Sequence, residues 1–455
     1  MRRGDTAGRW DVGSFSLALH QWRDAVAEDR VCPISLGNLL DSVRYGTGSP
    51  PPRVQISEKS VPFVRATDIK DGRILMDALP HVAAEQPKSM EKCRLSGGEL
   101  IIVRSGVNTG DCAVVPSELN GAYAAYDLIA VPNIRTISEY LCACLYTSFG
   151  RAQIDVVKNR AAQPHINANE VLALEVPDIS LDFQRRLITE LDAARAERDR
   201  AIETADELIH GFEPWALKTM GIKPSQPVRR NTFAIRIGRT KGRLDPFHYL
   251  PEFIEIERAI TSAPHARLGD LVVFSDDTWS PSKHAESTFR YIEISGVDRR
   301  RGKAVANTIT VADAPSRARL AVKPDDLIVS LTRPHHGSIA LLGDEHKGCV
   351  ASTGFSVIRN VANTTSKSFI WVVLRLSSSL QQMLRRASGG NYPAITQEEL
   401  GNVLVPLPSL EIQQLIIDEA TRRSAEADVL EARARQTWEH ARKRFEQQLL
   451  KGEGA

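Results

Sequence analysis

The chain of 455 residues contains one long segment twice. Residues 98 to 133 align without a gap on residues 325 to 360, and Gly110, Ala113 and Asn133 meet identical residues at an offset of 227 positions (337 − 110 = 227). The apolar positions of the two segments also match. Chance does not produce an alignment of this length, so the chain is built on an internal repeat.

The repeat extends in both directions from this segment. Downstream, Pro164 lies opposite Pro393 at an offset of 229 positions (393 − 164 = 229), and upstream, residues 61 to 74 correspond to residues 289 to 305. The repeated unit is nearly half of the chain, much longer than the repeats of solenoids and propellers. The sequence therefore predicts a tandem domain duplication. A chain of this kind usually contacts two equivalent partners or two equivalent half-sites.

The composition is that of an ordinary globular protein. Hydrophobic residues make up 42% of the chain and charged residues 25%, and the length allows two or three domains that each form a core. The first residues contain no apolar signal region, and no stretch approaches the roughly 18 to 20 apolar residues of a membrane span. We therefore expect a cytoplasmic protein.

The chain lacks the motifs of an adenine methylase and of a phosphate-binding enzyme. No Asn-Pro-Pro-Tyr signature of an adenine methylase is present, and the glycine-rich stretch SGVNTG lacks the Lys-Ser/Thr of a phosphate-binding loop. Six scattered cysteines suit neither a disulfide framework nor a zinc site, and the pair His335 and His336 has no third ligand at a suitable spacing. We expect no catalytic activity, no metal and no cofactor.

The overall charge of the chain neither supports nor excludes nucleic-acid binding. The net charge is +2, and a nucleic-acid binder needs a positive face rather than a positive total. Basic runs occur at residues 229 to 230, 236 to 243, 299 to 301 and 385 to 386. Each run taken alone is more typical of a solvated surface patch.

Two long helices are predicted, one after each copy of the repeat. Residues 181 to about 220 and 410 to about 450 show a heptad seam of mixed residues. Two arginines interrupt the first seam, so that helix needs a partner helix. An antiparallel pair, favoured over a parallel one, would hold the globular units at opposite ends of a pseudo-twofold. The positions expected to pack are Ile188, Leu191, Ile202, Ile209, Phe212, Ile417, Ala420, Trp438 and Phe445.

The globular units are expected to be mixed α/β domains. Short apolar runs between glycines and prolines predict strands, and longer runs predict helices. Polar, glycine-containing loops follow the first strand of each copy, and such loops often carry recognition residues. We expect strands at residues 99 to 104, 127 to 131, 327 to 331 and 355 to 358, helices at 138 to 155 and 367 to 386, and loops at 105 to 110 and 332 to 337.

Both copies resemble the target recognition domain of type I restriction-modification specificity subunits. The resemblance rests on GELIIVRSG and DDLIVSLTRPHHG, and on the passage into each long helix. That passage reads VPLPSLEIQQLI in the second copy, whereas the first copy, VPDISLDFQRRLI, lacks the second proline. The order of domain, proline-containing passage and helix occurs twice, as in the family.

The resemblance implies two α/β target recognition domains separated by two long antiparallel coiled-coil helices. It also implies a subunit without catalysis that binds double-stranded DNA and recruits two methyltransferase (modification) subunits and the restriction (motor-nuclease) subunits. The implied boundaries are a recognition domain at 1–180, a spacer helix at 181–220, a linker at 221–241, a second recognition domain at 242–408 and a second helix at 409–451.

The copies differ most in their polar loop residues, so we expect the two half-sites to differ in sequence. Arg, Asn, Gln, Ser and Thr have donors and acceptors that suit base edges. The candidate DNA contacts are Arg65, Thr67, Arg104, Ser105, Asn108, Thr109, Asn159, Arg160, Gln163 and His165 in the first copy, and Arg299, Arg300, Arg301, Thr332, Arg333, His335, His336, Asn391 and Tyr392 in the second.

A second function stays open at this point. A coiled-coil scaffold whose twin α/β domains bind proteins or glycans would show the same repeat and the same helices. Binding to DNA separates the two hypotheses, because phosphate contacts make affinity fall steeply with salt concentration.

Overall fold

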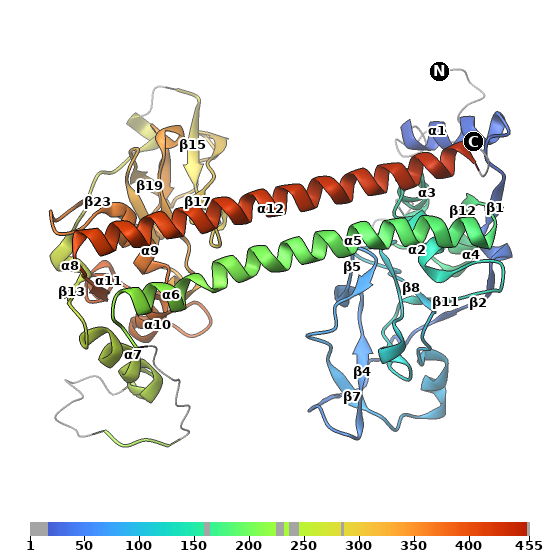
Figure 1. The fold of residues 1–455 in the computed structure, drawn as a ribbon, viewed down its shortest axis with the longest axis horizontal. Coiled ribbons are helices and arrows are strands. Elements are labelled where there is room, and N and C mark those ends of the chain that lie inside the picture. The colour runs from blue at the N-terminus through green and yellow to red at the C-terminus, as the bar shows by residue number, and fades with distance from the viewer. Residues whose placement is uncertain (1–16, 159–163, 224–231, 236–244, 284–285, 453–455) are drawn as a thin grey trace. The chain divides into compact units, whose positions relative to one another are not determined.

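The computed structural model describes residues 17–158, 164–223, 232–235, 245–283 and 286–452. It divides into two compact units, one of residues 1–200 with 432–455 and one of residues 201–431. Each unit contains one copy of the repeat and a part of both long helices, α5 (Leu181–His210) and α12 (Leu410–Lys451), and the elements are labelled in Figure 1.

The first unit is built on a four-stranded antiparallel sheet. Its order is β2-β11-β8-β9, with β2 at Leu40–Tyr45, β11 at Leu128–Pro132, β8 at Leu100–Ile102 and β9 at Cys112–Val114. Leu100 and Ile102 belong to the core shared with the helices, whereas Ile101 belongs to a second core on the other face. Because side chains alternate along a strand, β8 is buried on both faces.

A second sheet in the first unit has the order β10-β4-β7-β3. The strands are β10 (Tyr123–Ala124), β4 (Ser60–Val64), β7 (His81–Ala83) and β3 (Arg53–Val54), and β4 and β10 run parallel. Two small antiparallel pairs complete the strands. They are β5 (Ile69–Lys70) with β6 (Arg73–Ile74), and β1 (Pro33–Ser35) with β12 (Glu175–Pro177).

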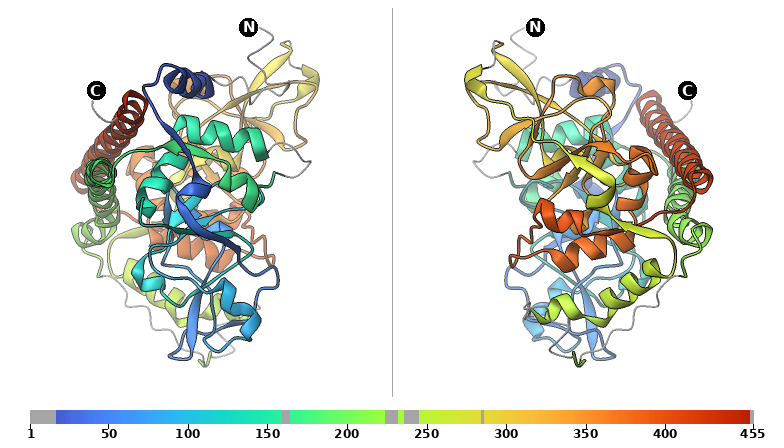
Figure 2. Two further views of the ribbon diagram at one scale, coloured as in Figure 1. Left: turned by 90° about the vertical axis from the view of Figure 1, so that its right-hand side faces the viewer. Right: turned by 90° about the vertical axis from the view of Figure 1, so that its left-hand side faces the viewer.

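Short helices pack on the first sheet of this unit and can be followed in the left view of Figure 2. They are α1 (Leu17–Ala27), α2 (Ser138–Leu145), α3 (Ser148–Lys158) and α4 (Ala168–Leu172), with 3₁₀ turns η2 (Leu36–Asn38), η3 (Ala66–Asp68), η4 (Lys88–Cys93) and η5 (Ser117–Leu119).

The second unit has the same two sheets. The first has the order β14-β23-β20-β21 and the second β18-β15-β22-β19. The first comprises β14 (Val272–Phe274), β23 (Phe355–Val361), β20 (Leu327–Ser330) and β21 (Ile339–Leu341), and the second β18 (Asn307–Thr310), β15 (Thr288–Ile292), β22 (Val350–Ser352) and β19 (Ala318–Ala321).

The remaining elements of the second unit repeat those of the first. The small pairs are β16 (Val297–Asp298) with β17 (Lys303–Ala304), and β13 (His265–Arg267) with β24 (Leu404–Pro406). The helices are α6 (Phe212–Thr219), α7 (Pro251–Thr261), α8 (Leu268–Leu271), α9 (Lys367–Leu374), α10 (Ser377–Arg386) and α11 (Gln397–Gly401), and the 3₁₀ turns are η7 (Pro246–Tyr249), η8 (Pro281–Lys283), η9 (Ile294–Gly296), η10 (Pro334–His336) and η11 (Asp344–His346).

The topology confirms the predicted mixed α/β duplication. The main sheets match strand for strand, and β15 pairs in parallel with β22 as β4 pairs with β10. The alternation of buried residues also matches, because Leu327 and Val329 face the helical core and Ile328 faces the opposite one. The second sheets differ at both edges. At one edge, β19 pairs with β22, whereas the first copy has only a single bridge at Arg94. At the other edge, β3 pairs with β7, whereas β18 is the edge strand among the described residues of the second copy.

Three predicted helices are shorter than the sequence indicated. The segments 138 to 155 and 367 to 386 each form two helices, because a glutamate caps the second helix at its start. Glu446 accepts a hydrogen bond from the Ser148 N–H at 3.0 Å, and Glu213 accepts one from the Ser377 N–H at 3.0 Å. The first long helix ends at His210 rather than near residue 220, since Pro214 has no N–H to donate to the preceding turn.

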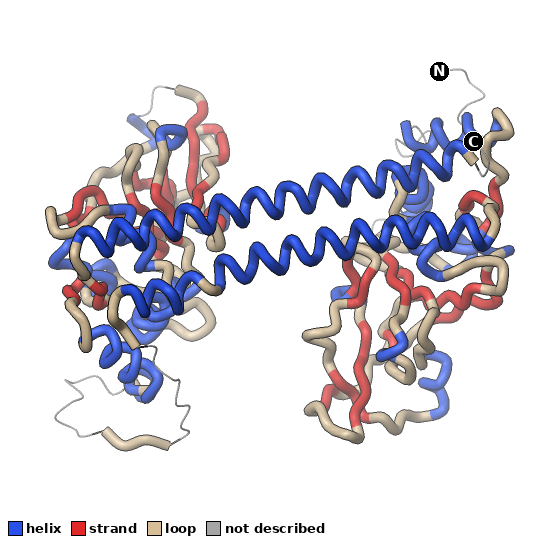
Figure 3. Tube along the Cα trace, viewed as in Figure 1, coloured by secondary structure: helices blue, strands red, loops and turns tan. Residues whose placement is uncertain are grey.

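The long helices run antiparallel within each unit. In the first unit, Ile188 and Leu191 share a core with Phe445, while Arg195, later in α5, lies over Trp438, earlier in α12. In the second unit, Arg423 donates a hydrogen bond to the Leu208 carbonyl at 3.3 Å. Figure 3 shows α5 and α12 as continuous helices. Small buried alanines along the seam, Ala205, Ala427 and Ala434, allow close packing.

None of the helices in the part of the chain that the structure describes is long and apolar enough to cross a membrane.

Candidate nucleic-acid interface

Two loops predicted as recognition elements lie side by side in the first unit. Ser105 pairs with His165 in an antiparallel bridge, and the Ile166 N–H donates to the Arg104 carbonyl at 2.9 Å. The Thr109 hydroxyl donates to the carbonyls of Gly106 at 2.7 Å and Pro164 at 3.1 Å. The hydrogen bonds join the loop after β8 to the segment before α4, so both present residues at one edge of the domain.

The second unit brings the equivalent loops together in the same way. Thr332 pairs with Ala394, and the Arg333 N–H donates to the Pro393 carbonyl at 2.7 Å. Arg333 has a left-handed backbone, with φ of 47°. Its equivalent in the first copy is Gly106, which has φ of 93°. A left-handed conformation costs a residue with a side chain about 1 to 2 kcal/mol relative to glycine.

The first loop is open and its tip faces solvent. Ser105, Gly106, Val107 and Asn108 are exposed, and Val107 is 99% exposed. Apolar and small polar side chains at such a tip suit the thymine methyl group and base edges. Among the predicted contacts of this copy, Ser105 and Asn108 are therefore available.

Arg104 lies against two neighbouring tyrosine rings beside this tip. Its guanidinium carbon is 4.3 Å from the ring centroid of Tyr126 and 4.9 Å from that of Tyr45. The two ring centroids are 6.4 Å apart. Its backbone N–H donates to Asp127 at 3.2 Å. Burial raises the pKa of the Asp127 carboxyl, although this backbone hydrogen bond opposes the shift.

The second loop is closed by a short 3₁₀ turn. Arg333 lies 4.4 Å from the ring centroid of Tyr392 and donates one hydrogen bond from Nη2 to the Asn391 carbonyl at 3.1 Å. Tyr392 is 71% exposed. Thr332 lies at the start of this loop, half-buried. The turn presents Arg333, Asn391 and Tyr392 together.

The two histidines of this turn pack edge to face, with ring centroids 4.5 Å apart. Burial lowers the pKa of His335, and the neighbouring His336 and Arg333 add to the effect. Burial also lowers the pKa of His336, as do Arg299 and Arg333. Arg299 donates to His336 Nδ1 at 3.3 Å. At neutral pH both rings therefore act as neutral hydrogen-bonding groups.

Arg300 and Arg301 require a correction to the predicted contacts. Arg301 is 8% exposed and pairs with Glu431 at 2.6 Å and with Asp428, both on α12. Arg300 pairs with Asp206 of α5 at 2.5 Å. Two carboxylates already hold Arg301 in a buried position, so this side chain attaches the domain to the helices. Only Arg299 of the basic run lies beside the recognition turn.

Three further predicted contacts have structural partners. Arg65 forms a bidentate pair with the buried Asp68, with Nη2–Oδ1 at 2.6 Å and Nε–Oδ2 at 2.8 Å. The hydrogen bond from Asp68 raises the pKa of Arg65 against the effect of burial. Thr67 lies next to this pair, within 3.5 Å of Asp68 Oδ1. Thr109 is 2% exposed. The burial of Thr109 corrects its assignment to DNA, whereas the half-buried Arg65 and the exposed Thr67 remain predicted contacts.

Other predicted contacts are placed as follows. His165 is exposed and lies in the loop bridge. Asn159, Arg160 and Gln163 lie outside the described residues.

The predicted helix-packing residues lie on the seam or in the adjoining cores. Ile188, Leu191 and Phe445 are buried, with Trp438 packed against them. In the second unit, Phe212, Ile417 and Ala420 pack against the core of the recognition domain. Ile202 and Ile209 are half-buried on α5.

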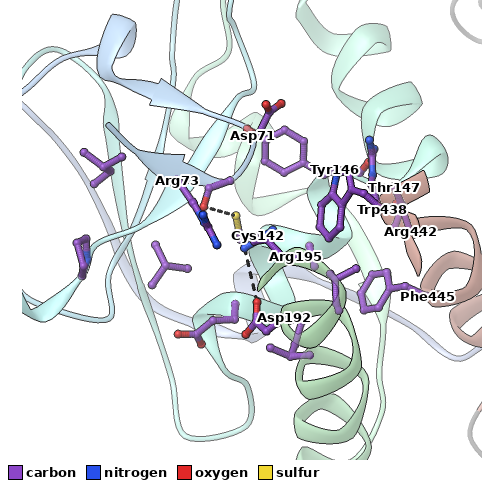
Figure 4. Close-up of a pocket in the computed structure, with 18 of the residues that line it drawn as sticks. Asp71, Arg73, Cys142, Tyr146, Thr147, Asp192, Arg195, Trp438, Arg442 and Phe445 are labelled. Carbon is purple, nitrogen blue, oxygen red and sulfur yellow. Dashed lines mark hydrogen bonds and ion pairs between the residues drawn. The ribbon is translucent and has the colours of Figure 1, made fainter. Parts of the chain in front are cut away.

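A cavity of about 910 Å³ lies in the first unit, between the β5-β6 hairpin, α2 and the two long helices. Figure 4 shows Cys142, Tyr146, Arg195 and Trp438 of α12 around this cavity. Arg73 lies on the hairpin side, where it pairs with Asp199 of α5.

The equivalent space in the second unit is filled. Trp371 and Arg375 occupy the positions of Cys142 and Tyr146, and the Arg375 guanidinium lies 4.6 Å from the Trp371 ring centroid. Trp371 approaches the hairpin turn so closely that a Cβ placed on Gly302 would lie only 2.6 Å from Trp371 Nε1. Burial lowers the pKa of Arg375 to about 10.

Sequence reasoning missed Tyr45, Tyr126 and Val107. The two tyrosines come from β2 and from the segment after β10, and only the sheet order brings them to Arg104. Val107 could have been noticed as an apolar residue between two glycines in a polar loop. Within the described ranges, no group of three or more His, Cys, Asp and Glu residues could hold a metal ion.

The second copy of the repeat matches a known family. The model of the type I restriction modification DNA specificity domain matches residues 266–422, which contain most of the second recognition domain and the start of α12. The second copy therefore contains a type I restriction modification DNA specificity domain. The first copy is its structural repeat, with the same main sheet and loop pair.

Individual relatives agree with this assignment. The chain is 29% identical over 110 residues to the type I restriction enzyme HindI specificity subunit of Haemophilus influenzae. The match covers 24% of each chain, so it spans about a quarter of that relative. A chain from a structure of complex assembly and conformational transition in the type I restriction-modification system has the same fold, with a TM-score of 0.51 and 17% identity over 92% of this chain and 96% of that one.

Proposed function

We propose that the chain is a type I restriction-modification specificity subunit that reads a split, asymmetric DNA sequence, with one recognition domain for each half, and that it has no catalytic activity of its own. One observation carries the proposal. The two domains share a topology and a hydrogen-bonded loop pair, Ser105 with His165 and Thr332 with Ala394. A repeated scaffold with loops in equivalent places suits the reading of two DNA segments.

The two halves of the target should differ in sequence. The first loop offers Ser105, Val107 and Asn108 at an open tip, whereas the second offers Arg333 and a pair of histidines in a closed turn. Direct readout depends on the donors, acceptors and methyl contacts that a side chain presents. Loops this different present different patterns to the bases.

The long helices are proposed to fix the separation of the two halves. The α12 helix has 42 residues, which corresponds to a length of about 63 Å at 1.5 Å per residue. A paired helix keeps a constant length better than a flexible linker does. The target should therefore contain a spacer of constant length.

The partners in this proposal follow from the family. The subunit would recruit two modification subunits, which methylate the DNA, and restriction subunits that join the same complex. Catalysis then belongs to the assembled complex, and the specificity subunit selects the site.

Mapping of methylated adenines tests the proposal. The chain is expressed with its modification subunit in a host without other methylases, and methylated sites are located across the genome. We expect two short half-sites of different sequence separated by a constant number of unspecified bases. Active methylation without such a motif would refute the reading of a split target.

A salt titration tests the contact with DNA separately. The complex of specificity and modification subunits is titrated with a duplex that contains the mapped site. The logarithm of affinity should fall steeply with the logarithm of salt concentration, since phosphate contacts release counterions. A complex that binds duplex with no dependence on salt would contradict the proposed interface.

A further inference from the structure

The two recognition domains share one arrangement of side chains, although the residues that form it are not at equivalent positions of the repeat. Each holds one arginine over an exposed tyrosine beside its recognition loop. In the first domain this is Arg104 with Tyr126, and in the second it is Arg333 with Tyr392. The two arginines are not equivalent in the repeat, because Arg104 aligns with Leu331 and Arg333 aligns with Gly106. Each copy thus reaches the same arrangement from a different position.

The Arg104 guanidinium is held in place but keeps its donors. It lies against the adjacent rings of Tyr45 and Tyr126, and these two contacts restrict its position. Within the part of the chain that the structure describes, the guanidinium makes no hydrogen bond or ion pair. The main chain is fixed on both sides, by Asp127 and by Ile166. A guanidinium restricted in position with five free N–H groups is suited to a flat ligand with adjacent acceptors.

A hollow of about 820 Å³ adjoins this arginine. Arg104, Tyr45 and Tyr126 line it together with Thr47 and Lys92. The donors of Arg104 therefore lie at an accessible, partly cationic surface rather than in the core.

Arg333 reaches its tyrosine at a cost in backbone conformation. It has φ of 47° where the first copy has a glycine. Backbone strain of this kind is maintained where the residue has a function. The side chain donates one hydrogen bond to Asn391 and lies over the 71% exposed ring of Tyr392. Glycine could form this turn without strain, so an arginine with a strained backbone is explained if its guanidinium has a function here.

We propose that Arg104 and Arg333 each read one guanine, one in each half of the target. Arginine forms two parallel hydrogen bonds to guanine O6 and N7, which are adjacent acceptors on the major-groove edge. Stacking on tyrosine orders the guanidinium before the DNA arrives, so less conformational freedom is lost on binding. The inference rests on the proposed function and adds the base and the two side chains that read it.

A contact with phosphate is the alternative that the test must separate. A phosphate needs charge but carries no sequence, so its loss weakens binding equally on all sequences. Lysine keeps the charge but lacks the planar fork of donors that matches guanine O6 and N7 and that stacks on an aromatic ring, so its preference for guanine should be weaker. Arg104→Lys and Arg333→Lys therefore distinguish base reading from phosphate binding.

The experiment maps methylated adenines for the complex that contains each lysine variant. Arg53→Lys and Arg317→Lys serve as matched controls, because both arginines are exposed in the first and second domains respectively. We expect Arg104→Lys to relax one guanine in one half-site and Arg333→Lys to relax one guanine in the other. The preference for guanine at that position should fall roughly 5- to 150-fold, and the controls should keep the full motif.

Several results would overturn the inference. They are a half-site without a G·C pair in the wild type, two variants that relax the same half-site, or variants that reduce methylation equally at all sites with the motif unchanged. A wild type that methylates without any split motif would instead refute the proposed function.

A variant without detectable methylation is resolved by binding. Wild-type and variant complexes are titrated with duplexes that carry guanine or 7-deazaguanine, which lacks N7, at the assigned position. The wild type should bind the modified duplex about tenfold more weakly, whereas the variant should bind both equally. Equal binding of both duplexes by the wild type would overturn the assignment.

Discussion

The two copies of the repeat attach to the long helices in different ways. In the first, Arg73 of the hairpin pairs with Asp199 on α5, and a cavity of about 910 Å³ lies beside it. In the second, Lys303 lies 3.6 Å from Asp428, the equivalent of Asp199. The position of the contact on the helix is the same, so the duplication preserved the attachment point.

The second copy has strengthened this attachment. Its hairpin turn contains residues 299 to 302, two more than the turn of the first copy, and the added arginines pair with Asp206, Asp428 and Glu431. Trp371 and Arg375 fill the space that stays open in the first copy. The comparison teaches that the topology of the copies has been kept while the interface with the helices and the recognition loops have diverged.

Lengthening the first helix should have the largest effect on function. Four residues inserted between Arg195 and Ala205 add about one turn, or 6 Å, and nearly restore the helical phase. If the copies are independent readers joined by helices, the target should gain spacer bases while both half-sites stay the same. Mapping of methylated adenines measures this.

An insertion of two residues is the control for this prediction. It turns the seam away from its partner helix, so methylation should fall at all spacings. Altered half-sites with an unchanged spacer in the four-residue variant would contradict the role of the helices.

Arg301→Ala should destabilise the second unit by about 2 kcal/mol, because it removes a buried guanidinium that pairs with Glu431 and Asp428, while Arg300 and Lys303 still lie beside these carboxylates. The matched change Arg73→Ala in the first copy removes a half-exposed pair and should cost less than about 1 kcal/mol. Chemical denaturation of the subunit measures both. Equal losses would show that the two attachments do not differ as described.

Trp371→Ala should cost about 2 kcal/mol, since it opens in the second copy a space like the one already present in the first. The equivalent change, Cys142→Ala, removes one sulfur atom beside an existing cavity and should cost under about 1 kcal/mol. Thermal unfolding gives both values. A larger loss for Cys142→Ala would break the comparison.

The smallest effect is expected on pH dependence. Hydrogen bonds from Arg422 and Arg423 lower the pKa of Glu419 to about 2. The folded state binds fewer protons than the unfolded state between about pH 4.5 and 2, so this stabilisation is complete above that range and is lost as the pH falls through it. Glu419→Gln should flatten the acid part of the profile of unfolding free energy against pH.

Glu190 is the control in the first helix, where alanines replace the two arginines. Glu190→Gln should leave the profile as it is. A similar change in both variants would assign the pH dependence to another group.

Much of the fold could be predicted from the sequence because its signals are local. Apolar runs at Leu100 and Leu327 become the central strands, and the heptad seam becomes the antiparallel helices. The break between α2 and α3 could not be predicted, because the capping Glu446 lies 298 residues away from Ser148. A capping residue from a distant part of the chain leaves no signal in the segment where the helix breaks.

The candidate site could be predicted only in part, because its loops have local signals and its side-chain contacts depend on distant residues. The sequence indicated the two loops, and the structure joins them through Ser105 and His165. It could not show that Arg301 points to α12 carboxylates, because an exposed basic run and a buried ion pair look alike in sequence. The contact of Arg104 with Tyr45 and Tyr126 depends on sheet order, which the local pattern does not contain.

Exchange of the second recognition domain tests the central claim most directly. Residues 242 to 406 are replaced by the corresponding domain of another specificity subunit, and methylated adenines are mapped for the assembled complex. If each copy reads its own half, one half-site should change to that of the donor while the other half-site is retained. A change in both half-sites would contradict the account of two independent readers.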